Sequence, residues 1–206
     1  MTQLIVLLDL VGIVAFAASG ALVAAKNKMD MFGGIVLAFV TGIGGGSLRD
    51  MLLDTPVFWL SQPNYLWACL LGFLIVALAM QRFGTAPRAT INFVDAVGLA
   101  VFTILGAQKT LALGHNEAVA VIMGMLTGCG GGMIRDILAN QVPAVLTRNR
   151  LYAVASLSGA VVFVGLVHYS PMLAMIGGFA TGFLVRLVAL FRNWRLPYFP
   201  DRKKDA

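Results

Sequence analysis

The chain has 206 residues, of which 59% are hydrophobic and only 12% are charged, and its mean hydropathy is +0.88. A soluble domain carries about 25% charged residues, so this composition excludes a water-soluble globular protein. The formal net charge of +6 leaves nucleic-acid binding to be decided by where the basic residues lie. The two cysteines, Cys69 and Cys129, lie in apolar runs and predict neither a disulfide framework nor a zinc site.

Apolar runs bounded by charges or by proline and asparagine turns predict an all-α integral membrane protein. Each run is close to the roughly 20 residues that a membrane-spanning helix needs. The first run has no basic segment before it and resembles the runs that follow, so we interpret it as a retained span and not as a signal peptide. The seven predicted transmembrane helices of this single membrane domain, residues 1–206, are 4–25, 32–53, 64–81, 92–112, 117–139, 151–168 and 171–191.

The basic residues predict the orientation in the membrane. The connections that reach one side all carry Lys or Arg, whereas the short connections on the other side carry none. The positive-inside rule therefore predicts an outside N-terminus and a cytoplasmic C-terminus for a multi-pass protein of the cell inner membrane. Because the basic residues then set topology, we expect contact with membrane lipids and no nucleic-acid partner. They are Lys26, Lys28, Arg82, Arg88, Arg148, Arg150 and the basic residues of the tail at 192–206.

The chain contains an internal repeat at a shift of 86 residues, which aligns without a gap. The pattern D-x-V-G-x3-F-x3-G-A begins at Asp9 and again at Asp95, and T-G-x-G-G-G-x2-R-D begins at Thr41 and again at Thr127. Each copy holds three predicted spans, so the second copy starts on the opposite side of the membrane from the first. The sequence thus predicts two inverted three-helix repeats and a separate seventh helix, which cover about 4–81, 92–168 and 171–191.

Each copy places three consecutive glycines inside a predicted helix. Three glycines cost a helix about 2–3 kcal/mol relative to alanines, which predicts a kink or an unwound turn. At the interface of inverted repeats such a break exposes backbone carbonyls to an ion or a solute. The alternative is that the glycines only let helices pack closely. The residues predicted to form the kinks and the ion pathway are Gly44, Gly45, Gly46, Gly130, Gly131 and Gly132.

Ionised side chains inside the spans repeat as well. An unpaired ion at such depth costs several kcal/mol, so we predict that Arg49 pairs with Asp9. The equivalent pair in the second copy is Arg135 with Asp95. These pairs either lock helices together or also contact the permeant ion, and the carboxylates that follow the arginines either cap the next segment or line vestibules. The predicted intramembrane charge set is Asp9, Arg49, Asp50, Asp95, Arg135 and Asp136.

Lys109 has no counterpart in the first copy, where valine occupies the position. It shares a helix face with Asp95, so it either gates the pathway as a voltage-sensitive plug or snorkels to the outer surface. Arg186 is predicted to be a snorkelling anchor near the inner end of the last span. His115 and His168 lie in external connections without a cluster of cysteines or carboxylates, which predicts no metal site.

The sequence contains no nucleophile elbow, no HExxH zinc motif and no phosphate-binding loop, because the triple glycines lack the following Lys-Ser/Thr. We therefore predict that the protein is not an enzyme and needs no cofactor. The expected ligands are a permeant K⁺ or Na⁺ and membrane lipid.

The duplicated GGGxxRD signature, the three-plus-three helices and the seventh helix resemble the prokaryotic branch of the trimeric intracellular cation channel family. The resemblance covers nearly the whole chain. It implies a homotrimer in which each protomer has its own pore, bent at the two glycine runs and conducting K⁺ and, less selectively, Na⁺. It also gives Lys109 the place of the helix-four lysine with a gating role in animal members. Related sequences have been labelled glycine transporters.

The leading hypothesis is a passive monovalent-cation channel, with selectivity from backbone carbonyls at the kinks. The alternative is a secondary transporter for a small, glycine-like solute, in which helix N-termini bind a carboxylate and the Arg-Asp pairs form alternating gates. A third reading is a structural membrane scaffold, for which glycine-to-alanine changes at Gly45 and Gly131 would alter stability but no flux.

Overall fold

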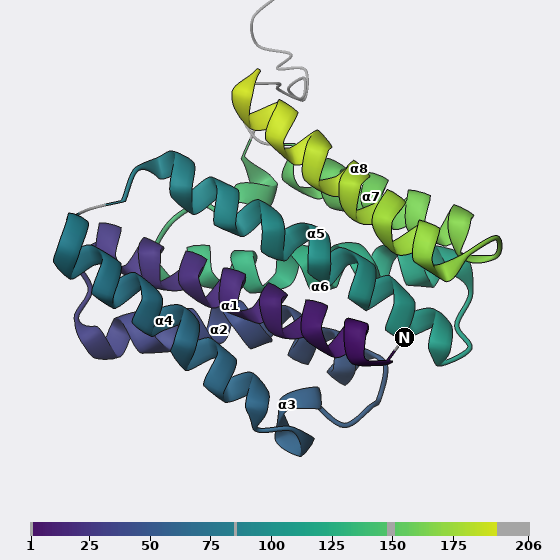
Figure 1. Ribbon diagram of the computed structural model, residues 1–206, viewed down its shortest axis with the longest axis horizontal. Helices are drawn as coiled ribbons and strands as arrows, with labels where there is room; N and C mark the ends of the chain where they lie inside the picture. The colour runs from purple at the N-terminus through teal and green to yellow at the C-terminus, as the bar shows by residue number, and fades with distance from the viewer. Residues whose placement is uncertain (1, 85, 148–150, 193–206) are drawn as a thin grey trace, which may run out of the picture.

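The computed structural model describes residues 2–84, 86–147 and 151–192, which form an all-helical membrane protein (Figure 1). The predicted all-α class is therefore confirmed. The basic residues Arg148 and Arg150, and the tail beyond Arg192, lie outside the described residues. The helices are α1 Thr2–Lys26, α2 Met31–Leu52, α3 Phe58–Ser61, α4 Asn64–Phe83, α5 Arg88–Ala112, α6 Glu117–Leu138, α7 Tyr152–Val167 and α8 Pro171–Phe191, with the 3₁₀ turn η1 at Ala144–Leu146.

Six of these helices, α1, α2, α4, α5, α6 and α8, are long and apolar enough to cross a membrane. The shorter apolar helix α7 has 16 residues, which extend about 24 Å at 1.5 Å per residue, whereas the hydrocarbon layer is about 30 Å thick. The predicted span 151–168 is therefore present as an apolar helix that is shorter than the other six, and its crossing of the membrane stays a prediction. Its run is as apolar as the others, and composition alone therefore could not separate it from them.

The helix boundaries recur at the shift of 86 residues. The bounds of α1 and α2, moved by 86 positions, are those of α5 and α6. The caps recur too, because the Asp30 side chain accepts a hydrogen bond from the Gly33 N–H at 2.7 Å and the Asn116 side chain accepts one from the Val119 N–H at 2.9 Å. Such caps satisfy backbone donors that the first helical turn leaves without a partner.

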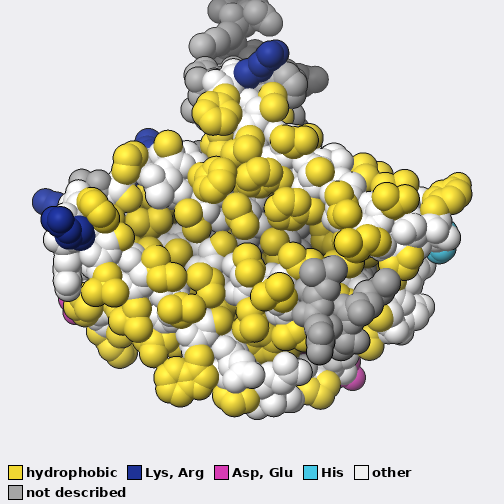
Figure 2. All heavy atoms as spheres, in the orientation of Figure 1, with side chains coloured by type: hydrophobic (Ala, Val, Ile, Leu, Met, Phe, Trp, Pro, Cys, Tyr) yellow, Lys and Arg dark blue, Asp and Glu magenta, His cyan; other side chains and the backbone are white. Residues whose placement is uncertain are grey.

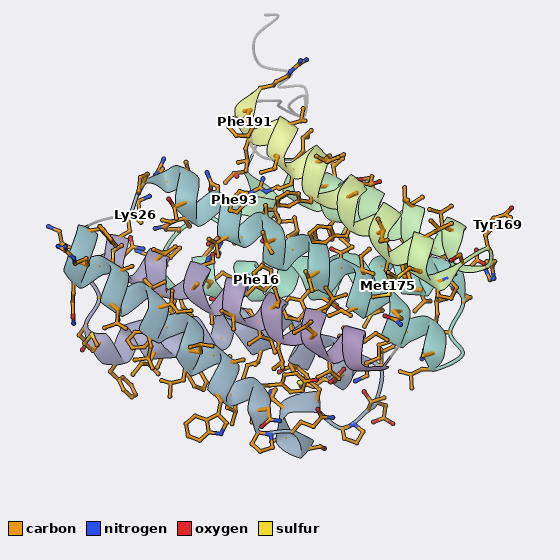
Figure 3. All side chains as sticks on the ribbon, in the orientation of Figure 1. Phe16, Lys26, Phe93, Tyr169, Met175 and Phe191 are labelled. Carbon is orange, nitrogen blue, oxygen red and sulfur yellow. The ribbon has the colours of Figure 1, made fainter. Side chains whose placement is uncertain are left out.

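The helices pack as two connected groups. Helix α1 contacts α2, α4 and α5, helix α2 contacts α6, and α7 and α8 pair with each other beside α5. In Figure 1, α1 runs from right to left and α5 from left to right. The centre of the bundle is aromatic, with the rings of Phe16 and Phe102 5.3 Å apart, and Figure 3 labels Phe16 midway along α1. Any side chain at Gly98 would overlap the Phe16 ring, so this glycine is required for the contact.

The outer surface is mainly apolar. Figure 2 shows a face covered by hydrophobic side chains, with Lys and Arg gathered at its left and upper edges. Large apolar side chains are exposed along the helices, including Trp67 at 67%, Leu78 at 64% and Ile176 at 55%. Contiguous exposed apolar area on this scale needs an apolar environment, which the lipid bilayer provides. Figure 3 places Lys26 and Tyr169 at opposite ends of the molecule.

Candidate functional site

The glycine runs of α2 and α6 lie where these two helices cross. A side-chain carbon on Gly45 would overlap the carbonyl oxygen of Thr127, and one on Gly131 would overlap the carbonyl oxygen of Thr41. These contacts are reciprocal, because each residue lies 86 positions from its counterpart in the other contact. Reciprocal contacts are what a two-fold relation between two copies produces. Only glycine lets the two backbones approach this closely.

The first glycines of the two runs extend the crossing. A side-chain carbon on Gly130 would lie 3.1 Å from the Cα atom of Gly45. Both α2 and α6 are α-helical without interruption through their glycines, so the predicted unwound turn is wrong. The physical reason is that close packing of the helices stabilises the regular backbone despite the low helix propensity of glycine. The other predicted form of the kink, a bend that keeps the helical hydrogen bonds, stays a prediction for both glycine runs, 44–46 and 130–132.

The last glycine of each run makes room for an aromatic side chain. A side-chain carbon on Gly46 would lie 2.6 Å from the ring of Phe58, and one on Gly132 would lie 2.7 Å from the hydroxyl of Tyr152. Both aromatic residues belong to the surroundings of a buried charge cluster. The glycines therefore position the clusters as well as the helix crossing.

The first charge cluster consists of Asp9, Arg49, Asp50 and Lys109. The Asp50 carboxylate is fully buried, and its Oδ1 lies 2.7 Å from both Arg49 Nε and Lys109 Nζ. Its Oδ2 accepts a hydrogen bond from the Phe58 N–H at 3.0 Å. This carboxylate therefore caps the backbone after α2 and holds two cations at once.

The predicted ion pair between Arg49 and Asp9 is wrong. No ion pair within 4.0 Å joins them among the described side chains, and Arg49 pairs with the next residue, Asp50. The half-buried Asp9 lies beside the Tyr65 hydroxyl and is attracted by Arg49 and Lys109 at longer range. The sequence pattern could not show this, because consecutive helical residues ordinarily point in different directions.

The second charge cluster consists of Asp95, Arg135, Asp136 and Arg186. Arg135 Nη1 lies 2.6 Å from Asp95 Oδ1, so the structure contains the pair that the sequence predicted. Arg135 Nη2 lies 2.8 Å from Asp136 Oδ1, and Nη1 also donates to the Ser19 hydroxyl. Asp136 Oδ2 accepts from the Ala144 N–H at 2.8 Å. This last bond is the repeat equivalent of the one between Asp50 and the Phe58 N–H.

Arg186 and Tyr152 are members of this site that the sequence did not reveal. Arg186 is fully buried, so its prediction as a snorkelling anchor is wrong. Its guanidinium carbon lies 4.6 Å from the centre of the Tyr152 ring, and Nη2 lies 3.9 Å from Asp95 Oδ2. The Tyr152 hydroxyl donates to Asp95 Oδ1 at 3.3 Å. The sequence held one indication that Arg186 is buried, its distance from the end of the span. Five residues of α8 follow it before the helix ends.

A polar cavity of about 230 Å³ opens beside the second cluster. Asp136 lines it and also caps the turn at Ala144, so this carboxylate has both functions that the sequence left open. Lys109 lies 14 positions after Asp95 along α5, so about 21 Å of helix separates it from the cavity. Among the described residues, no group of three His, Cys, Asp or Glu side chains could hold a metal ion. The charged and polar lining residues are Lys26, Arg88, Asn92, Asp95, Arg135, Asp136, Gln141 and Thr147.

These features define a polytopic α-helical membrane protein whose interior carries two charge clusters at opposite ends of a glycine crossing. A sequence model of the family described as glycine transporter matches residues 6–81 and 92–168, one segment for each copy of the repeat. Solved structures that match the chain are prokaryotic TRIC channels. The chain therefore belongs to the family of trimeric intracellular cation (TRIC) channels, as a prokaryotic member, and the glycine-transporter model matches the same chain.

Individual relatives match over almost the full chain. The UPF0126 membrane protein of Vibrio cholerae is 42% identical, covering 96% of this chain and 84% of the relative. The UPF0126 inner membrane protein YadS of Escherichia coli is 39% identical, covering 96% and 97%. The TRIC channel orthologue from Rhodobacter sphaeroides is 39% identical with a TM-score of 0.83, covering 92% and 98%. A prokaryotic TRIC channel solved in 0.5 M KCl is 32% identical with a TM-score of 0.88, covering 95% and 100%. The matched structures are channels, and this likeness supports a cation channel.

Proposed function

We propose that this protein is a potassium-conducting, monovalent-cation channel with one pore in each protomer. The observation that carries the proposal is the likeness of the entire fold to solved TRIC channels, at TM-scores of 0.83 and 0.88. The proposal requires no cofactor, because the permeant ion is itself the ligand. The buried charge clusters support it, since ionised side chains inside a membrane bundle are costly and mark ion pathways.

The proposed pathway joins the two clusters through the glycine crossing. Its inner entrance is the 230 Å³ cavity, which Asp95 and Asp136 line together with three basic side chains. Its far end is the first cluster, where the Lys109 side chain is 31% exposed and reaches buried Asp50. Because α2 and α6 keep their helical hydrogen bonds, carbonyls freed at the glycines no longer supply an ion site in this proposal. Carboxylates at the entrances take that place, and Lys109 is the proposed gate.

The proposed membrane arrangement consists of two inverted repeats with an outside N-terminus and a cytoplasmic C-terminus. Repeated helix bounds, opposite courses of α1 and α5, and reciprocal contacts at Gly45 and Gly131 support the inversion. The orientation is supported by Lys26, Lys28 and Arg82 at one end of the bundle. We further propose a homotrimer in the cell inner membrane, surrounded by bound lipid, because the matched structures are trimeric channels.

Planar-bilayer recording of the purified protein tests the channel. With KCl at different concentrations on the two sides, we expect unitary currents whose reversal potential shifts toward that of K⁺. Asp95→Asn should lower the conductance at low KCl, where local cation enrichment by a carboxylate matters most. Glu117→Gln is the matched control, because Glu117 is exposed and pairs with His168 outside the proposed pathway. Absence of unitary current, or a reversal potential that follows Cl⁻, would overturn the proposal.

The description of the matching family favours a second candidate, a secondary transporter for a glycine-like solute. In this candidate the zwitterion would use the same cavity, with its carboxylate facing Lys26 or Arg88 and its ammonium facing Asp95. Proteoliposomes loaded with buffer and supplied with radiolabelled glycine test it. Saturable uptake that unlabelled glycine competes away, without unitary currents in bilayers, would replace the channel by this transporter.

A further inference from the structure

Arg186 is exceptional among the described charged side chains because it is completely buried and its guanidinium nitrogens have no hydrogen-bond partner. Buried polar groups in folded proteins are nearly always hydrogen-bonded, so an arginine with idle donors calls for an explanation. The Tyr152 ring below it supplies a cation–π contact at 4.6 Å but accepts no conventional hydrogen bond from it. The idle donors lie next to Asp95, with Nη2 3.9 Å from Oδ2.

Asp95 is already engaged on its other oxygen. Oδ1 accepts hydrogen bonds from Arg135 at 2.6 Å and from the Tyr152 hydroxyl at 3.3 Å, whereas Oδ2 faces Arg186 at the longer distance of 3.9 Å. The two arginines differ in position. Arg135 lines the 230 Å³ cavity, whereas Arg186 is not among its lining residues. The Asp95 carboxylate thus has two arginine neighbours: Arg135, which lines the proposed pathway, and Arg186, which does not.

We propose that Arg186 is the reserve counter-ion of Asp95. When Arg135 moves out of its ion pair, Asp95 closes the remaining gap to Arg186 and keeps a buried partner. Removing one partner of a buried ion pair is unfavourable because the other charge stays buried without a partner. With Arg186 beside it, Asp95 keeps a partner when Arg135 leaves. The open position of the inner entrance is the one in which Arg186 holds Asp95. This inference rests on the proposed channel function and assigns a positioning residue to it.

The charge count supports a specific need for Arg186. Arg135 alone faces two carboxylates, Asp95 and Asp136, which would leave the buried cluster with an excess negative charge. Arg186 makes the set neutral, and it comes from α8, the helix outside the repeat. Its guanidinium lies 3.9 Å from Asp95 and does not line the cavity, so neutrality is kept without adding a cation to the pathway.

A stability cycle tests the pairing without any measurement of ion flow. Arg135→Gln, Arg186→Gln and the double variant are purified in detergent, and their thermal unfolding midpoints are compared with that of the wild type. We expect the double variant to lose more than the sum of the single losses, because either arginine alone can hold Asp95. Adding Asp95→Asn should remove this excess. Additive losses, or an excess that persists with Asp95→Asn, would overturn the proposal.

Channel recording then tests the role in opening. Arg186→Gln should lower the open probability by at least about fivefold, the lower end of typical couplings, with unchanged unitary conductance and K⁺/Na⁺ permeability ratio. Arg186→Lys should retain most of the open probability, and Asp95→Asn added to Arg186→Gln should restore it. Mere misfolding would give neither rescue.

Arg82→Gln is the matched control, since Arg82 also lies over an aromatic ring, at 5.9 Å from Phe83, but on the exposed surface. It should leave the open probability unchanged. An Arg186→Gln channel that opens as often as the wild type would overturn the reserve role. A wild type without current would overturn the proposed function instead, while the stability cycle would still decide the pairing.

Discussion

The two charge clusters are built on the same repeated residues but differ in their fourth charge. In the first cluster this charge is Lys109, a flexible side chain that is 31% exposed and hydrogen-bonded to Asp50. In the second it is Arg186, which is fully buried, stacked on Tyr152 and without a hydrogen bond. The same sequence motif thus supports one cluster whose fourth charge reaches solvent and one whose fourth charge is enclosed by the protein.

This difference follows from which helix supplies the additional cation. Lys109 stands near the end of α5, where its long side chain reaches water and can leave Asp50 at little cost. Arg186 lies inside α8, where no water replaces a lost partner. We infer that the first cluster responds to voltage or solution, whereas the second responds through displacement of Arg135.

The largest effect is expected at the crossing that both halves share. Gly45→Ala places a methyl group onto the Thr127 carbonyl and should lower the free energy of unfolding by about 3 kcal/mol, the upper range for overpacking. Gly131→Ala should cost about the same, because its contact with Thr41 is equivalent. Chemical denaturation in detergent measures both. Gly165→Ala is the matched control in open space and should stabilise α7 by up to about 1 kcal/mol. Clearly unequal losses at the two crossing glycines would contradict the two-fold relation.

The next effect separates the clusters. Arg135→Gln should cost about 3 kcal/mol, because Asp136 loses its cation inside the protein and Asp95 must rely on the more distant Arg186. Arg49→Gln should cost only about 1–2 kcal/mol, since Lys109 still pairs with Asp50. Equal losses, measured by the same denaturation assay, would mean that the fourth charge does not distinguish the clusters.

The labile partner gives the third prediction. Lys109→Gln removes the mobile cation while Asp50 keeps Arg49, so the free energy of unfolding should fall by no more than about 1 kcal/mol. If Lys109 gates the pathway, the open probability should rise severalfold at the polarity that closes the wild type. Lys28→Gln is the control, because this exposed lysine lies in the connection between α1 and α2. Unchanged voltage dependence in Lys109→Gln would remove the gating role.

The sequence predicted the architecture where the signal is continuous along the chain. Hydropathy placed most span ends within two residues of the helices, as for 117–139 against Glu117–Leu138, because lipid imposes apolar runs of fixed length. The start of α5 was missed by four residues, since its first turn contains Arg88 and Asn92 follows shortly after. The pair of Arg135 with Asp95 was predictable, because both residues repeat and an unpaired ion is costly.

The remaining features depend on three-dimensional distances that periodicity does not encode. Arg49 forms its ion pair with the adjacent Asp50, a carboxylate that Lys109 and the Phe58 N–H also contact. Arg186 looked like an interfacial anchor because only the packing of α7 and α8 reveals that no path to water remains. The continuity of the helix through Gly131 follows from its contact with α2, which local helix propensity ignores.

The smallest effect concerns the two tyrosines that accompany the clusters. Tyr152→Phe removes the hydroxyl that donates to Asp95 but keeps the ring beneath Arg186, so it should cost about 1 kcal/mol, the typical net contribution of one hydrogen bond. Tyr65→Phe should cost less than about 0.5 kcal/mol, because its partner Asp9 is half-buried and water can replace the hydroxyl. Thermal unfolding of the two variants in one detergent measures the difference. A Tyr65→Phe loss equal to that of Tyr152→Phe would show that Asp9 is as isolated from water as Asp95. The contrast between the clusters would then rest on Lys109 and Arg186 alone.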